Sequence, residues 1–164
     1  MMHRKKCSAV IKHLSEADLG YMAGILDGEG SICIVRMLRG SPKVSFNVQV
    51  SITNTDLVML DWLTDRLGGS IIVHGRYKGT GKMCFRWYMG GYSALPVLER
   101  LKPYLMVKKR QADLAIHFLL LARKWSWEAR AVMYEDMKKL NGSQRFPANF
   151  SPTARKQVSS EATH

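Results

Sequence analysis

The segment from Lys43 to Thr53 alternates strictly between polar and apolar residues. The apolar parity comprises Val44, Phe46, Val48, Val50 and Ile52, and the polar parity comprises Lys43, Ser45, Asn47, Gln49 and Ser51. Because successive side chains of a strand point to opposite faces of a sheet, this pattern predicts a strand with one buried and one open face. Such strands belong to antiparallel sheets that are covered by helices on one side only.

The flanking sequence predicts the other elements by similar reasoning. Ser15 to Asp18 resembles a capping box, and it precedes a helix from Leu19 to Leu26 that Asp27-Gly28 is expected to end. Further strands are predicted at Ser31 to Arg39, Ser70 to Lys78 and Lys82 to Met89, and further helices at Leu57 to Leu67, Leu95 to Leu101, Lys108 to Lys124 and Ser126 to Leu140. The order predicts an α+β fold with an αββαββα core.

Length and charge restrict the domain organisation and the partner. The 164 residues, of which 46% are hydrophobic and 23% charged, predict one domain over residues 1–142. Residues 1–12 read as a basic arm and residues 143–164 as a Ser/Pro-rich basic tail. A net charge of +12 favours nucleic acid as the partner. A ribosome-associated or membrane-surface protein is the alternative, but no polybasic block or amphipathic Lys-rich helix supports the membrane.

Cysteine usage and hydropathy bear on the compartment. Cys7, Cys33 and Cys84 form no C-x-x-C pair, so neither a disulfide framework nor a zinc knuckle is expected. The apolar runs are shorter than the roughly 20 residues that span a bilayer, so no membrane association is expected. The basic start is not followed by an apolar stretch, unlike a secretory signal. We expect an intracellular protein, either in a microbial cytoplasm or in an organelle such as a chloroplast or mitochondrion.

The polar parity of the predicted strands carries groups that recognise DNA. Arginine, lysine, glutamine, asparagine and serine pair with base edges and phosphates, and a β-ribbon fits the major groove. A merely solvated face is the alternative. The candidate DNA-binding residues are Arg39, Lys43, Ser45, Asn47, Gln49, Ser51, His74, Arg76, Lys78, Lys82, Arg86 and Tyr88. In this interpretation the sheet has helices on one face and DNA on the other.

One motif suggests a family. Met22-Ala23-Gly24-Ile25-Leu26-Asp27-Gly28-Glu29-Gly30 resembles the nonapeptide of LAGLIDADG homing endonucleases, and its departures keep the chemical type or size. Asn54-Thr55-Asp56, the two hairpins and Lys102 to Ala112 extend the resemblance over roughly residues 12 to 140. The nonapeptide occurs once, so the chain is similar to the single-motif members that act as homodimers.

The resemblance implies an activity. A homodimer with a saddle-shaped sheet would bind a long, near-palindromic duplex DNA site. Each subunit would hydrolyse one phosphodiester across the minor groove with a divalent metal, leaving 3′ overhangs. An RNA maturase or a DNA-binding regulator without nuclease activity is the alternative.

Glu29 is the central candidate for catalysis. Without the motif it would read as a surface carboxylate beyond a helix end. The small residues Gly20 and Gly24 let two copies of the helix approach closely, and we expect a dimer interface at Gly20, Ala23, Gly24 and Asp27. Two Glu29 carboxylates beside a DNA backbone would require cations, and Mg²⁺ suits such a site, with Mn²⁺ expected to substitute. The resemblance adds the Gly28 carbonyl as a second metal ligand.

The remaining candidates rest on the resemblance. Lys108 lies in the stretch where the family carries an active-site lysine, which would stabilise developing charge. Lys109 is the alternative, and either residue could be a simple phosphate contact. Asp27 is structural by resemblance, and one of Gln49, Ser51 and Thr53 is expected to orient water. No glutamine or arginine stands just after that strand.

Overall fold

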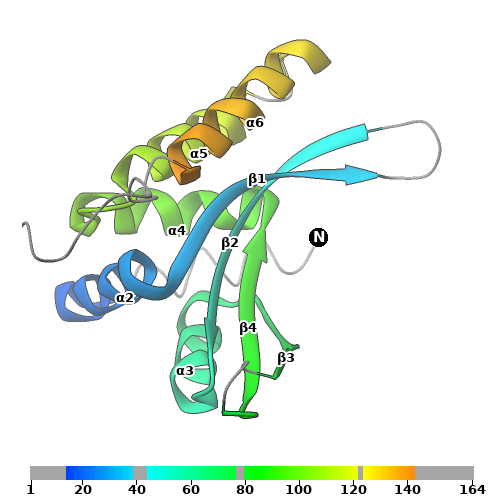
Figure 1. Ribbon diagram of the computed structural model, residues 1–164. Helices are drawn as coiled ribbons and strands as arrows, with labels where there is room; N and C mark the ends of the chain where they lie inside the picture. Colours follow the sequence, from blue (N-terminus) through cyan, green and yellow to red (C-terminus); the bar gives the residue numbers. More distant parts are fainter. Residues whose placement is uncertain (1–13, 39–43, 77–79, 122–123, 143–164) are drawn as a thin grey trace, which may run out of the picture.

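The computed structural model describes residues 14–38, 44–76, 80–121 and 124–142, and the predicted arm and tail lie outside these ranges. Its elements are α2 (Glu16–Glu29), β1 (Gly30–Leu38), β2 (Val44–Asn54), α3 (Leu57–Leu67), β3 (Ser70–Arg76), β4 (Met83–Gly90), η1 (Gly91–Ser93), α4 (Ala94–Leu101), η2 (Lys102–Tyr104), α5 (Lys109–Leu121) and α6 (Trp127–Gly142) (Figure 1). This order confirms the predicted α+β class.

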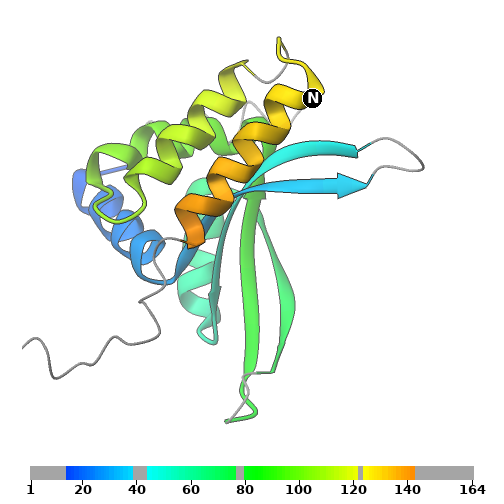
Figure 2. The same ribbon diagram turned by 45° about the horizontal axis from the view of Figure 1, so that its top comes forward.

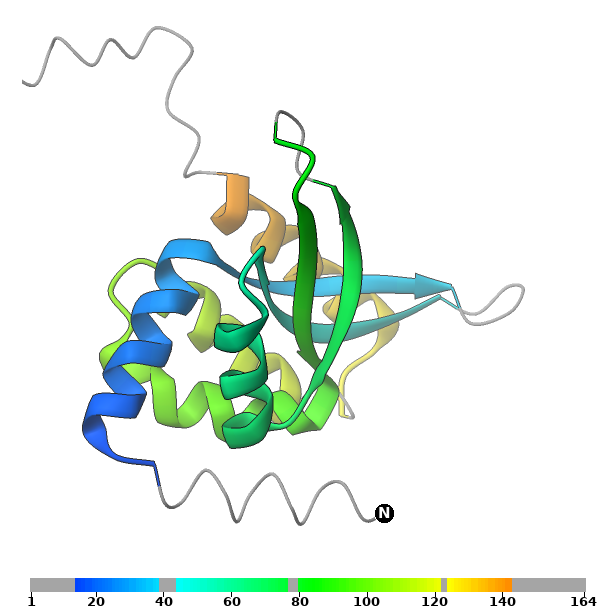
Figure 3. The ribbon, with the colours of Figure 1, turned by 90° about the horizontal axis from the view of Figure 1, so that it is seen from below.

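The four strands form one antiparallel sheet in the order β1-β2-β4-β3. Each hairpin pairs neighbours in sequence, and β2 joins β4 through pairs such as Thr53 with Arg86. The β1–β2 pair and the β3–β4 pair run in different directions, so the sheet is strongly twisted (Figure 3).

The helices pack on one face of this sheet. Val48, Val50 and Ile52 of β2 are each at most 3% exposed, which confirms the parity predicted from the alternation. Trp87 and Met89 of β4 are equally buried. α5 and α6 lie side by side and contact β1 and β2 (Figure 2). None of the helices that the structure describes lies on the opposite face of the sheet.

Helix starts follow the predicted capping chemistry. The Ser15 hydroxyl accepts from the Asp18 N–H, and the Asp18 carboxylate accepts from the Ser15 N–H, which confirms the capping box. The Asp56 carboxylate caps α3 through the Val58 N–H. Ser93 is the exception, because it precedes α4 without a side-chain cap.

The expected end of the first helix is wrong. α2 continues through Gly28 to Glu29, and Gly28 does not adopt the left-handed conformation. The chain instead turns directly into β1 at Gly30, whose N–H donates to the Leu26 carbonyl. A Cβ at Gly30 would lie 2.7 Å from the Leu26 carbonyl oxygen and 2.9 Å from Leu26 Cα, so the close approach of the backbone at this junction requires glycine.

A β-bulge interrupts the pairing of β3 with β4. Ile72 pairs with Arg86 and Val73 with Phe85, but Gly75, not His74, pairs with Cys84. One extra residue reverses the alternation beyond it, so Arg76 lies opposite Met83. Arg76 and Arg86 therefore lie on opposite faces of the sheet, although the sequence pattern predicts both on the same face.

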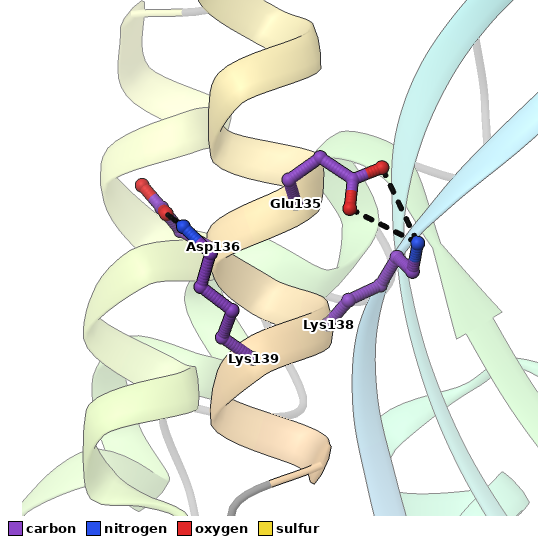
Figure 4. A network of polar contacts seen from close by, with 4 residues as sticks. All are labelled: Glu135, Asp136, Lys138 and Lys139. Carbon is purple, nitrogen blue, oxygen red and sulfur yellow. Dashed lines mark hydrogen bonds and ion pairs between the residues drawn. The ribbon is translucent and has the colours of Figure 1, made fainter.

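The helical layer presents a solvated outer surface. On α6, Lys138 bonds to Glu135 and Lys139 to Asp136, one turn apart (Figure 4). Exposed pairs of this kind add little stability. No helix in the described part of the chain is long and apolar enough to cross a membrane.

Candidate active site and nucleic-acid interface

Glu29 contacts an asparagine from the neighbouring strand. Glu29 is the last residue of α2, its side chain is exposed, and its Oε2 accepts a hydrogen bond from Asn54 Nδ2. Asn54 is the last residue of β2, and its Oδ1 accepts from the Asp56 N–H at 2.9 Å. The second bond fixes the orientation of the amide, so its NH₂ group faces Glu29. Asn54 is not among the site residues predicted from the sequence, because an Asn two residues before Asp56 looks like part of a helix start.

Asp27 joins α2 to the segment before α5. Its Oδ2 accepts from the N–H groups of Met106 at 2.7 Å and Val107 at 3.1 Å, and its Oδ1 accepts from the Lys108 N–H at 2.9 Å. Partial burial raises the pKa of Asp27, but these three bonds and the Lys108 charge outweigh it, and the net shift is downward. Asp27 is thus structural within its own subunit.

The Asp27 contacts also position Lys108. The Lys108 side chain is buried, and its Nζ donates to the Asp27 carbonyl oxygen, two residues before Glu29. Burial lowers the pKa of the ammonium below its ordinary value, and the Asp27 carboxylate opposes part of that shift. The structure therefore places Lys108 against Asp27 in the last turn of α2, whereas Lys109 is exposed.

Asp27→Asn is expected to destabilise the fold at neutral pH by about 2 kcal/mol, because an amide loses the charge-assisted bonds to backbone N–H groups. The lowered pKa of Asp27 means that its contribution is present above the unfolded-state value of about 3.9 and is lost as the pH falls through the folded-state value. Urea unfolding at several pH values measures this difference. A gap between wild type and variant that stays constant down to acid pH would contradict the assignment.

The donor set around Glu29 suits a hard cation. The Glu29 carboxylate is exposed, and the Gly28 carbonyl lies in the last turn of α2, where carbonyl groups lack the next turn of helix as a partner. Within the described residues, no three His, Cys, Asp or Glu side chains gather into a metal site. Glu29 and Gly28 therefore fit a cation whose remaining ligands come from water, phosphate or a second subunit.

The structure exposes some of the predicted dimer-interface residues and buries others. Gly20 and Gly24 lie on the exposed side of α2, and a Cβ on either would meet nothing within 4 Å. Ala23 instead packs in the core of its own subunit, at 1% exposure. Asp27 is used within the subunit, as described above. Of these four predicted interface residues, Gly20 and Gly24 are the exposed ones.

The open sheet face gathers most of the predicted DNA-binding residues. Asn47, Gln49, Ser51, Arg86 and Tyr88 are half-buried there, and His74 is exposed. Lys82 is exposed just before β4, and Arg76, also exposed, lies beyond the bulge on the parity of Met83. Ser45 departs from the expectation, because its Oγ is buried without a hydrogen-bond partner in the described part of the chain. Arg39, Lys43 and Lys78 lie outside the described residues.

Charge is distributed unevenly between the sheet and the helices. Residues 30–55 and 67–98, which include all four strands, contain no aspartate or glutamate. The ion pairs found among the described residues involve helical side chains, as on α6 in Figure 4. The basic residues of the sheet are therefore not neutralised by acids on the strands, and they produce a positive surface.

Comparison with known proteins finds sequence similarity to a DNA endonuclease. No protein-family model matches the sequence. The DNA endonuclease I-CvuI of Chlorella vulgaris is 29% identical over 104 residues, which span 60% of this chain and 62% of that protein, less than two thirds of its length.

Solved structures share the fold. I-CvuI in complex with its DNA target in the presence of Ca gives a TM-score of 0.64 at 23% identity, over 80% of this chain and 87% of that one. The archaeal intron-encoded homing endonuclease I-Vdi141I with DNA gives 0.64 at 16% identity, over 83% and 90%. The LAGLIDADG homing endonuclease I-GzeII with its DNA target gives 0.54 at 17% identity, over 85% and 48%. In the nonapeptide of α2, in this sequence match and in the shared fold, the chain is similar to LAGLIDADG homing endonucleases.

Proposed function

We propose that this protein is a site-specific homing endonuclease that binds duplex DNA and hydrolyses its phosphodiester bonds with a divalent metal. The observation that carries the proposal is the grouping of Glu29, Asn54 and Lys108 at the end of α2. This group stands where α2 meets β1 and β2, beside a sheet face that is polar and free of acidic residues.

The polar sheet face fits duplex DNA. Twisted antiparallel strands follow the major groove, and uncompensated basic side chains bind phosphates. The related I-CvuI and I-Vdi141I were solved in complex with DNA, which agrees with this use of the sheet. One face of this chain would thus read the target while the helices support it from behind.

Each residue of the site has a distinct task. The Asn54 amide holds the Glu29 carboxylate in one orientation, and Lys108 provides a positive charge near the same helix end. A divalent cation held by Glu29 and the Gly28 carbonyl would stabilise the negative charge that develops on the phosphodiester oxygens. Mg²⁺ is the cation we propose. I-CvuI structures have been determined with Ca and with Mg present, and the DNA was not cleaved in the latter.

We further propose that two copies pair through the glycine face of α2, formed by Gly20 and Gly24. Exposed helical glycines that no neighbour in the subunit requires allow close approach of a second helix. Pairing across a two-fold axis would bring two Glu29 residues together, one for each DNA strand. Cleavage of each strand once, across the minor groove and with 3′ overhangs, follows from this arrangement by family resemblance.

Gly24→Leu is expected to yield folded monomers that no longer cleave. The leucine side chain finds open space in the subunit and favours helix by about 0.8 kcal/mol over glycine, so the fold should persist while the two helices are kept apart. Light scattering and cleavage assays measure the two effects. Gly142→Leu, at another open helical glycine, is the matched control and should stay dimeric. An active Gly24→Leu dimer would exclude this interface.

The proposed activity is tested with a randomised duplex library and with structured RNA. In Mg²⁺ the wild-type protein should cut a subset of duplexes that share a near-palindromic sequence, and in Ca²⁺ it should bind the same subset. Sequence-specific duplex binding without cutting in any divalent metal would instead indicate a regulator. Tight binding to RNA without DNA cleavage would indicate a maturase.

A further inference from the structure

The guanidinium of Arg86 is held on the open face of the sheet by two side chains. Its Nε donates to Thr53 Oγ1 at 3.4 Å, and its Nη2 bonds to His74 Nε2 at 3.0 Å. Thr53 lies on β2, Arg86 on β4 and His74 on β3, so the contacts cross three adjacent strands.

The chemistry of the two contacts leaves a defined set of donors free. A guanidinium only donates hydrogen bonds, so His74 Nε2 is the acceptor in this contact. Nε and one N–H of Nη2 are then occupied, while N–H groups remain on both Nη1 and Nη2. That pair of nitrogens matches a pair of acceptors on one base edge.

His74 lies at the β-bulge in β3, two residues after Ile72, the pairing partner of Arg86. Val73 pairs with Phe85 and Gly75 with Cys84, so His74 is the extra residue between them. Gly75 has a φ of 131°, a conformation that L side chains rarely adopt. As the unpaired residue of the bulge, His74 accepts the hydrogen bond from Arg86.

We propose that Arg86, held by Thr53 and His74, determines specificity by reading one guanine in each half of the DNA target. This inference rests on the proposed function. A fixed arginine donates to O6 and N7 of guanine in the major groove, and no other base offers two acceptors there. Thr53 immediately precedes Asn54, which contacts Glu29, so the guanine belongs to the part of the half-site nearest the cleaved bond. His74 and Thr53 are positioning residues.

Base preference, measured apart from cleavage, tests the proposal. Wild type and variants are incubated in Ca²⁺ with a randomised duplex library, and the bound DNA is sequenced. Wild type should select guanine at one position in each half-site, and Arg86→Ala should lose about 10-fold to 100-fold of that preference while other positions stay unchanged. His74→Ala should lose part of it at the same position, and His74→Gln, which keeps an acceptor, should restore some.

Arg76→Ala is the matched control. Arg76 is an exposed arginine of β3, and its Nη1 donates to the Gly81 carbonyl in the turn. Its loss should weaken binding to all duplexes alike, without changing base preference. Thr53→Val keeps the shape of the side chain but removes the oxygen that accepts from Arg86. It should reduce the same guanine preference, and it keeps the proposal testable if the arginine variant misfolds.

The outcomes separate this inference from the proposed function. If wild type selects no duplex sequence at all, the proposed function itself fails. If wild type selects a sequence but Arg86→Ala weakens all duplexes equally, Arg86 is a phosphate contact and the inference is overturned. A changed preference at one position in Arg86→Ala, with an unchanged profile in Arg76→Ala, supports it.

Discussion

Glu29→Gln is expected to lower the rate of DNA cleavage by at least about 10³-fold, because the amide binds a divalent cation poorly and metal stabilisation of a phosphodiester is worth several kcal/mol. Glutamine keeps the length of the side chain and an acceptor for the Asn54 amide, so the local geometry should survive. The fold should be unaffected, because the Glu29 side chain is exposed.

Binding separates this effect from a loss of DNA recognition. In Ca²⁺ the affinity of Glu29→Gln for the target should equal or exceed that of wild type, because a negative charge near phosphates has been removed. Glu99→Gln, which neutralises an exposed carboxylate on α4, is the control and should cleave normally. Full activity of Glu29→Gln would remove Glu29 from the metal site.

Lys108→Met is expected to reduce cleavage by about 10²-fold to 10³-fold, the usual loss when one donor near a developing negative charge is removed. Methionine fills similar space in a buried position, and the substitution relieves the desolvation that lowers the pKa of Lys108. Thermal unfolding should therefore show a fold at least as stable as wild type. Single-turnover cleavage measures the catalytic effect directly.

Lys109→Met is the matched comparison. Lys109 is exposed, so its loss should weaken DNA binding slightly and leave the single-turnover rate at saturation near that of wild type. The reverse result, with a slow Lys109 variant and a fast Lys108 variant, would transfer the proposed role to Lys109. If both substitutions lower the single-turnover rate equally and only slightly, both lysines are phosphate contacts.

Local patterns predicted the elements of the fold well. The strict alternation in β2 assigned the buried face correctly, and the capping box at Ser15 fixed the start of α2. These signals depend on side chains within a few residues of one another, which a sequence displays directly. The nonapeptide also predicted Glu29 as a site residue from the sequence alone.

The sequence predicted less well the features that depend on distant contacts. Asn54 contacts Glu29 across 25 residues, and Lys108 contacts Asp27 across 81. The bulge at His74 changes the parity of Arg76, although the residues around it still alternate plausibly in the sequence. Ala23 looked like one of the small residues of the dimer face, but only packing shows which side of a helix faces the core.

The bonds between Asp27 and the segment before α5 have a consequence for how the molecule comes to be active. They close a loop of 81 residues, and such distant contacts form late because chain entropy must be lost first. A newly made chain can carry Glu29 on a formed helix while Lys108 is still elsewhere. The positioning of Lys108 therefore depends on a contact that forms late, and a chain without that contact would lack the lysine of the proposed site.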